Sequence, residues 1–229
     1  MKKNLTVVSL FLRSTLYKTL WMIAAMVLWE MVSFYVVLQT PVLSLEDAVA
    51  KSFLKYIFMG ALVLIGFRVL LNFKSIASSY TSRLMMVEKR AIYYDQVIAA
   101  GLIFLILFLV QQAFVLFLGN IYIWMQPEQF ITNQTLFLAF YRSDFLHFLI
   151  PLSNLAAWLK LAVIIALLAF ACAFMPSQKV NINIVQPMAF VLTAVLSVKK
   201  YTDGWNYISI PVFILLTAVL IANSCRRDD

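Results

Sequence analysis

The chain has 229 residues, of which 64% are hydrophobic and only 12% are charged, and its mean hydropathy is +0.93. Soluble domains carry about 25% charged residues, so this chain has too few charges to cover a water-facing surface. The composition excludes a soluble globular protein and indicates an integral membrane protein. The net charge is +8, but the basic residues stand singly or in pairs between apolar runs. This spacing favours membrane orientation over nucleic-acid binding.

Apolar windows long enough to span a bilayer recur along the chain. A hydrocarbon core of about 30 Å needs roughly 20 apolar residues per helix, and open strand edges would leave backbone groups unpaired in lipid. We therefore predict an all-α, polytopic fold with six transmembrane helices. The predicted spans are residues 20–39, 53–71, 97–118, 159–175, 182–198 and 207–223. The fifth is short and contains Pro187, and it is included because it brings both chain ends to one side.

Six spans divide the basic residues unequally between the two sides of the membrane. Twelve fall on the side of the two termini and six on the other, which predicts a chain in the cytoplasmic membrane with both termini in the cytoplasm. The cytoplasmic set is Lys2, Lys3, Arg13, Lys18, Arg68, Lys74, Arg83, Lys89, Arg90, Lys179, Arg226 and Arg227. The outer set is Lys51, Lys55, Arg142, Lys160, Lys199 and Lys200.

The first 18 residues have the pattern of a basic amphipathic helix. At 100° per residue one side carries Leu5, Val8, Phe11, Leu12 and Leu16, and the other carries Thr6, Ser9 and Arg13. This pattern predicts a separate helix at residues 1–18 that lies on the inner leaflet. The alternative is a longer first helix that extends into the cytoplasm.

The connection at residues 72–96 reads NFKSIASSYTSRLMMVEKRAIYYDQ and contains neither Pro nor Gly. It is too long for a tight turn, and we predict that it is helical, with residues 88–94 leading straight into the third span. Its tyrosines, methionines and charges of both signs are typical of a protein contact surface. The alternative is a solvated loop whose basic residues only fix the topology.

The outer connection at residues 119–158 is far longer than a normal loop. Its most apolar part, residues 134–152, is interrupted by Arg142, Asp144 and His147. Central charges cost about 2.5–3.5 kcal/mol each in a span, so we expect an interfacial or re-entrant helix instead of a seventh span.

The chain has no recognisable catalytic or metal-binding motif. His147 is the single histidine, and Cys172 and Cys225 are predicted to be free thiols without metal-ligand spacing. We therefore predict no enzymatic activity, no catalytic residues and no bound metal.

Polar residues inside the spans are the remaining candidate sites, namely Glu30, Arg68, Gln111 and Gln112. A carboxylate in mid-membrane must be protonated, paired or facing water. Glu30 is therefore either part of a substrate path or a helix-packing residue with a polar partner such as Gln111 or Gln112. Arg68 either reaches toward Glu30 or extends to the cytoplasmic interface.

The run Ser79-Tyr80-Thr81-Ser82-Arg83-Leu84-Met85-Met86-Val87-Glu88-Lys89-Arg90 is similar to the Tyr-Thr-x-x-Arg-Leu-x-x-x-Glu-Arg run of small bacterial type-2 ATP-binding-cassette permeases. The predicted topology resembles that family over nearly the whole chain. The resemblance implies that residues 72–96 form a cytoplasmic coupling helix that docks on a separate ATPase subunit. The contact residues would be Tyr80, Arg83, Leu84, Glu88 and Arg90.

The resemblance further implies a permease that acts as an exporter, pairing with a second copy or a related permease. ATP and magnesium would be bound by the partner ATPase subunits, and this chain would need no cofactor of its own. Two other functions stay open: a substrate-binding subunit of a vitamin-type importer, in which residues 119–158 would form the lid, and a membrane accessory protein without transport.

Overall fold

The computed structural model describes residues 2–40, 44–78, 89–125, 133–151 and 155–173. Within this part of the chain the regular elements are all helices, which confirms the all-α class there. Four of these helices have the length and apolar composition of membrane spans: Val8–Leu38, Leu54–Ile76, Ala91–Met125 and Leu155–Cys172. They coincide with the first four predicted spans. The predicted spans at 182–198 and 207–223 lie outside the described residues, so six spans remain a prediction.

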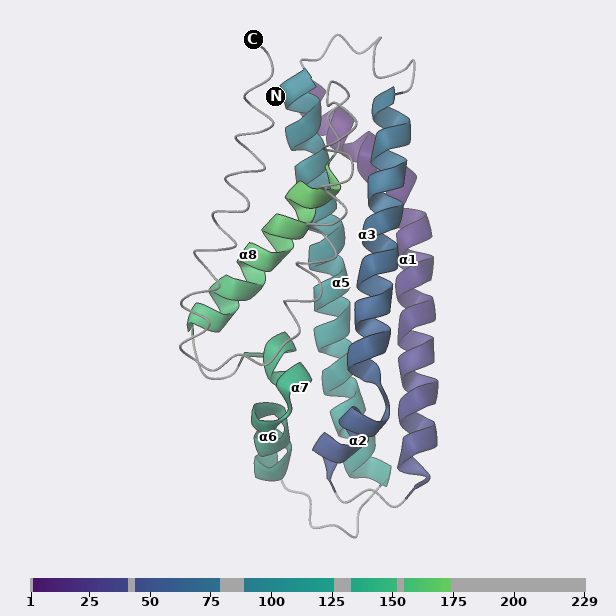
Figure 1. Ribbon diagram of the computed structural model, residues 1–229, viewed down its shortest axis with the longest axis vertical. Coiled ribbons are helices and arrows are strands. Elements are labelled where there is room, and N and C mark those ends of the chain that lie inside the picture. The colour runs from purple at the N-terminus through teal and green to yellow at the C-terminus, as the bar shows by residue number, and fades with distance from the viewer. Residues whose placement is uncertain (1, 41–43, 79–88, 126–132, 152–154, 174–229) are drawn as a thin grey trace.

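The long helices form a bundle, and the short helices gather at one of its ends (Figure 1). The long ones are α1 (Lys2–Leu38), α3 (Leu54–Ser78), α5 (Lys89–Met125) and α8 (Leu155–Cys172). The short ones are α2 (Leu45–Lys51), α6 (Asn133–Arg142) and α7 (Asp144–Leu149). Helix α1 packs along α3 and α5, and α8 packs against the other side of α5. The start of α1, the end of α3 and the start of α5 lie together at the opposite end of the bundle.

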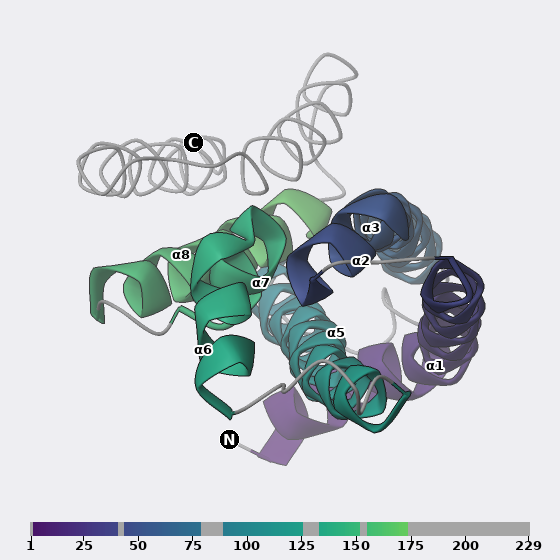
Figure 2. The same cartoon turned by 90° about the horizontal axis from the view of Figure 1, so that it is seen from below.

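Helix α1 is one continuous helix of 37 residues, which corrects the prediction of a separate helix at residues 1–18. The alternative of a longer first helix is the one observed. Its first turns nevertheless run obliquely across the end of the bundle before the helix follows the bundle axis (Figures 1 and 2). The predicted amphipathic sides are present, because Phe11 is buried and Arg13 is exposed. The apolar side of the first 18 residues therefore packs against the bundle, as its pattern indicates. The helix nevertheless continues past residue 18 without a break.

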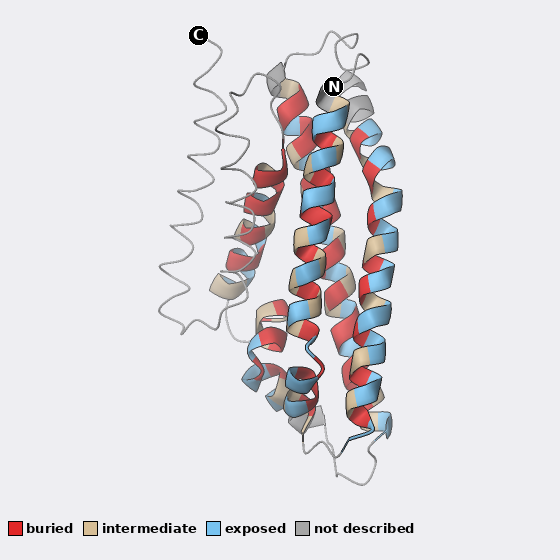
Figure 3. Cartoon of the chain, turned by 45° about the vertical axis from the view of Figure 1, so that its right-hand side comes forward, coloured by how far each residue is buried: buried red, intermediate tan, exposed pale blue. Residues whose placement is uncertain are grey.

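Helices α1 and α3 bury a narrow stripe and leave most of their surface at least partly exposed, whereas α5 and α8 bury more of theirs (Figure 3). In α1 the stripe recurs every third or fourth residue, at Phe11, Thr15, Thr19, Ile23, Met26, Glu30, Phe34 and Leu38. The outer surface of the same helix carries Leu28, Trp29 and Val32, which are 63%, 67% and 62% exposed. A soluble protein rarely leaves so much apolar surface in water. A bundle surrounded by lipid can, which fits a multi-pass membrane protein.

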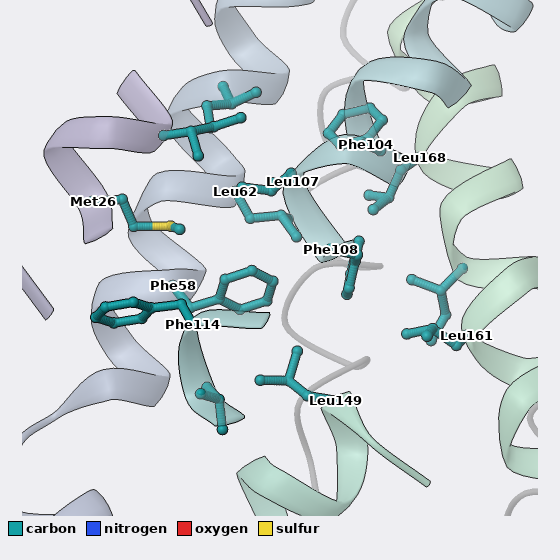
Figure 4. Packing of buried hydrophobic residues seen from close by; sticks show 14 of the residues in the cluster. Met26, Phe58, Leu62, Phe104, Leu107, Phe108, Phe114, Leu149, Leu161 and Leu168 are labelled. Atoms are coloured by element: carbon teal, nitrogen blue, oxygen red, sulfur yellow. The ribbon is translucent and has the colours of Figure 1, made fainter. Parts of the chain in front are cut away.

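Aromatic rings fill the centre of the bundle between α3 and α5. Phe58 and Phe108 meet edge to face with ring centroids 5.4 Å apart, and Phe108 also contacts Phe148 at 6.3 Å. Figure 4 shows Met26 and Phe114 next to Phe58 in this cluster. Because lipid tails are as apolar as these side chains, close packing stabilises such an interior more than exclusion of water does.

Residues 134–152 do not form a span, as predicted. Helix α6 ends at Arg142 and α7 begins at Asp144, with Ser143 between them. The Ser143 amide donates to the Ala139 carbonyl at 3.0 Å, and the His147 amide donates to the Ser143 carbonyl at 2.9 Å. Arg142 and Asp144, two of the residues that argue against a seventh span, therefore lie at the junction of α6 and α7.

A tight corner joins α2 to α3. Ser33 of α1 donates its hydroxyl to the Ser52 carbonyl at 2.6 Å, and the Ser52 hydroxyl donates to the Val49 carbonyl at 3.1 Å. Phe53 follows with a φ of 55°, in the left-handed region that favours glycine. The two hydrogen bonds of Ser52 therefore hold the chain next to a large aromatic residue in a strained backbone conformation.

We expect Phe53→Gly to be more stable than Phe53→Ala. Both variants remove the exposed ring, but only glycine removes the left-handed penalty, which is about 1 kcal/mol. Unfolding of the two purified variants in detergent, followed by circular dichroism, measures the difference. Equal stability, or a more stable alanine variant, would show that the corner is not strained.

Candidate functional site

Two polar features of the bundle join helices that are far apart in the sequence. The first is the contact between Glu30 of α1 and Gln111 of α5, whose residues are both 0% exposed. The Gln111 side-chain amide donates to Oε1 of Glu30 at 3.0 Å and to Oε2 at 2.8 Å. Both oxygens of the carboxyl group are therefore satisfied by one amide.

Apolar side chains enclose the Glu30–Gln111 contact. The residues one turn away on each helix, Met26, Phe34, Leu107 and Val115, are all buried. Among the described residues, the side-chain oxygen Oε1 of Gln111 has no hydrogen-bond partner. The pair is thus an isolated polar link inside an apolar interior, where an interhelical hydrogen bond holds two helices in register.

Gln112 has a different role from its neighbour. Its amide donates to the carbonyl oxygen of Leu149 at 2.7 Å, and Leu149 is the last residue of α7. Carbonyls at the end of a helix lack an intrahelical partner, so Gln112 satisfies one of them. The two glutamines bind different helices, and Gln111 is the one that meets Glu30.

Arg68 does not reach Glu30, which corrects one of the two readings of this residue. It is exposed on α3 together with Leu64 and Leu71, which lie four residues before it and three after it. Residues at this spacing share one helix face, and here that face points away from the bundle. In the described part of the chain Arg68 makes no hydrogen bond or ion pair.

The second polar feature, which we call the clasp, joins the start of α1 to the end of α3. It consists of Phe11, Ser14, Thr15, Asn72 and Phe73. The side-chain amide of Asn72 donates to the hydroxyl of Thr15 at 2.5 Å and to that of Ser14 at 3.2 Å. The rings of Phe11 and Phe73 meet edge to face at 5.2 Å. The clasp fixes the oblique first turns of α1 against α3.

A further contact at this end joins α5 to α8. The hydroxyl of Tyr93 donates to the carbonyl of Phe170 at 3.5 Å. Asp95 and Gln96 follow in α5, and both are buried, at 4% and 0% exposure. Side-chain contacts at this end thus join α1 to α3 and α5 to α8.

Most of the predicted coupling residues are not in the described part of the chain. Tyr80, Arg83, Leu84 and Glu88 lie outside it, and Arg90 lies in the first turn of α5. The prediction that residues 88–94 lead into the third span is confirmed from Lys89 onward. Sequence reasoning missed the clasp, because Asn72 and Thr15 belong to no motif and their 57-residue separation gives no signal.

The remaining chemical groups are structural in the described residues. Cys172 is a free, buried thiol that donates to the Gly66 carbonyl at 3.6 Å. The ring of His147 packs edge to face on Tyr141 at 5.4 Å. In the described ranges no three His, Cys, Asp or Glu residues gather at one point. Cys225 lies outside these ranges.

Comparison of the chain with protein-family models, with curated proteins and with solved structures finds no match. The functional argument therefore depends on the residues and contacts of this chain.

We expect the Glu30–Gln111 contact to appear as a coupling free energy between the two residues. Gln111→Leu leaves a buried carboxyl group without its partner, which costs about 1–3 kcal/mol. In Glu30→Leu/Gln111→Leu both polar groups are gone, so we expect its loss to be smaller than the sum of the single losses by about 1 kcal/mol. Unfolding in sodium dodecyl sulfate, followed by tryptophan fluorescence, measures the two single variants, Glu30→Leu and Gln111→Leu, and the double variant.

The matched control replaces the neighbouring glutamine. Glu30→Leu combined with Gln112→Leu should be additive, because Gln112 binds Leu149 instead. A coupling of zero between positions 30 and 111, or an equal coupling between 30 and 112, would contradict the structural role given to the pair.

Proposed function

We propose that the chain is the permease subunit of a bacterial type-2 ATP-binding-cassette transporter and that it acts as an exporter. Two separate ATPase subunits bind ATP and magnesium below the membrane. Two copies of this chain, or this chain and a related permease, form the pathway. The permease supplies no catalytic group and converts movement of the ATPase subunits into altered access across the membrane.

The observation that carries the proposal is the length of the two helices that flank residues 79–88 in the chain. Helix α3 continues to Ser78 and α5 begins at Lys89, so each helix extends beyond its apolar span toward the segment with the permease-like sequence. A force applied there acts directly on the ends of two long helices. A flexible polar loop next to each span would absorb such a force.

The contacts at this end support transmission to the other described helices. Asn72, six residues before the end of α3, bonds to Ser14 and Thr15 of α1. Tyr93, four residues after the start of α5, bonds to α8. A displacement of residues 79–88 would therefore move α3 and α5 directly. It would reach α1 and α8 through these hydrogen bonds and through the packing of α1 on α3 and α5 and of α8 on α5.

Reversing two charges in the segment tests the docking of the ATPase. We expect Arg83→Glu/Glu88→Arg to reduce the amount of ATPase that co-purifies with the chain at least about tenfold, because charge pairs at interfaces are worth 2–5 kcal/mol or more when one partner is changed. The measurement is magnesium-dependent ATP hydrolysis in the complex purified from the membranes of its own host.

The control for this variant is Lys51→Glu, a charge reversal in α2 at the other end of the bundle, where the residue is exposed. It should leave the complex intact. Equal ATPase recovery from the wild type and Arg83→Glu/Glu88→Arg, or no ATP-hydrolysing partner in the wild-type complex, would refute the proposal.

The clasp gives a second test that separates docking from coupling. Asn72→Leu removes both hydrogen bonds to α1 but leaves residues 79–88 unchanged. We expect the ATPase to bind as before, while stimulation of its hydrolysis by the permease falls toward the rate of the ATPase alone. Unchanged stimulation would show that the clasp does not transmit movement.

A further inference from the structure

An open groove lies at the end of the bundle that is opposite the clasp. Its volume is about 370 Å³, and α2, the start of α3 and the junction of α6 and α7 form its walls. Helices α2 and α6 pack against each other at this end (Figure 2). Buried Val49, Ser143 and Phe145 contribute to its lining. The groove is separate from the Glu30–Gln111 contact, because neither residue lines it.

Charges of both signs line the groove in equal number. Glu46 and Asp144 supply carboxylates, and Lys55 and Arg142 supply cations. Among the described residues, Glu46, Lys55 and Arg142 form no hydrogen bond or ion pair. A ligand with one sign of charge would pair either with Glu46 or with the two cations, whereas a ligand that carries both signs can pair with all three.

Two aromatic rings complete the lining. Phe53 and Tyr56 are 62% and 67% exposed, and their ring centroids lie 6.1 Å apart. Phe53 is also the residue whose backbone lies in the left-handed region, with a φ of 55°. Exposed aromatic faces attract substituted ammonium groups, so the rings and the carboxylates favour the same kind of cation.

The surroundings of the groove indicate its depth in the membrane. Exposed aromatic side chains are present at this end on α1, α5 and α6, at Tyr35, Trp124 and Tyr141, which are 52%, 83% and 53% exposed. Tyrosine and tryptophan concentrate at the level of lipid headgroups. A groove within this band opens where headgroups are the most abundant zwitterions.

We propose that the groove binds a zwitterionic phosphate–ammonium headgroup and that its source is a phospholipid such as phosphatidylethanolamine. Lys55 and Arg142 bind the phosphate, because guanidinium and ammonium groups form charge-assisted hydrogen bonds with phosphate oxygens. Glu46 binds the ammonium group beside the two rings. This inference goes beyond the proposed transport function and does not depend on it.

Native mass spectrometry of the full chain, purified in detergent, tests the proposal. The chain is equilibrated with phosphatidylethanolamine or with phosphatidylglycerol, which has the phosphate but no ammonium group, and the bound lipid is counted. We expect the wild type to retain phosphatidylethanolamine about tenfold more than phosphatidylglycerol. Equal retention of the two lipids would overturn the proposal.

Single substitutions assign the two halves of the headgroup. Arg142→Gln and Lys55→Gln should each lower retention of phosphatidylethanolamine about tenfold, and Glu46→Gln should reduce the preference over phosphatidylglycerol. The matched control is Lys51→Gln, because Lys51 is an exposed cation of α2 that does not line the groove. Circular dichroism verifies that each variant is folded. Groove variants that bind lipid as Lys51→Gln does would contradict the assignment.

Soluble phosphoethanolamine distinguishes the source of the ligand. If it does not displace the bound lipid while the variants behave as expected, the site recognises the phospholipid. If it displaces the lipid at millimolar concentration, the headgroup chemistry is supported, but the proposed phospholipid source is wrong. No ATPase is present in this assay, so its outcome is independent of the charge-reversal test at Arg83 and Glu88.

Discussion

The constraint on which the structure depends is that a polar group inside a lipid-spanning helix must find its partner within the protein. The long helices meet it with a few side chains that reach a neighbouring helix. Gln111 binds both oxygens of Glu30, and Gln112 binds the last carbonyl of α7. Cys172 binds a carbonyl of α3. These contacts fix the register of helices whose apolar packing alone, by Leu and Phe against lipid-like neighbours, specifies register less strictly.

The same constraint explains why the two ends of the bundle differ from its middle. Asn72 and Tyr93 make their contacts at one end, beside the segment with the permease-like sequence. At the other end the short helices α2, α6 and α7 and the first turn of α3 carry the charged residues of the groove. A bundle with a rigid apolar interior and two polar ends suits a protein that passes movement from one side of a membrane to the other, as proposed for a permease.

The sequence predicts the parts of the fold that depend on local patterns. The positions of the first four spans follow from apolar length, and the absence of a span at residues 134–152 follows from Arg142, Asp144 and His147. The division of this segment into two helices, α6 and α7, was not predicted. Glu30 and Gln111 were recognisable as a candidate pair, because a buried carboxyl group requires a donor. The sequence left the direction of Arg68 open between Glu30 and the cytoplasmic interface, because the face that α3 buries depends on where α1 and α8 lie. The clasp was hidden for the same reason: Asn72 and Thr15 become partners only when α1 crosses the end of α3.

Labelling of single cysteines with a membrane-impermeant maleimide tests most directly whether the long helices separate two polar ends across a membrane. Cys172 and Cys225 are first replaced by serine, and one cysteine is then placed at Lys51, Arg142, Ser9 or Lys74. We expect the cysteines at 51 and 142 to react in intact cells and those at 9 and 74 to react only after the membrane is permeabilised. Reaction of positions 51 and 74 from the same side would contradict the account.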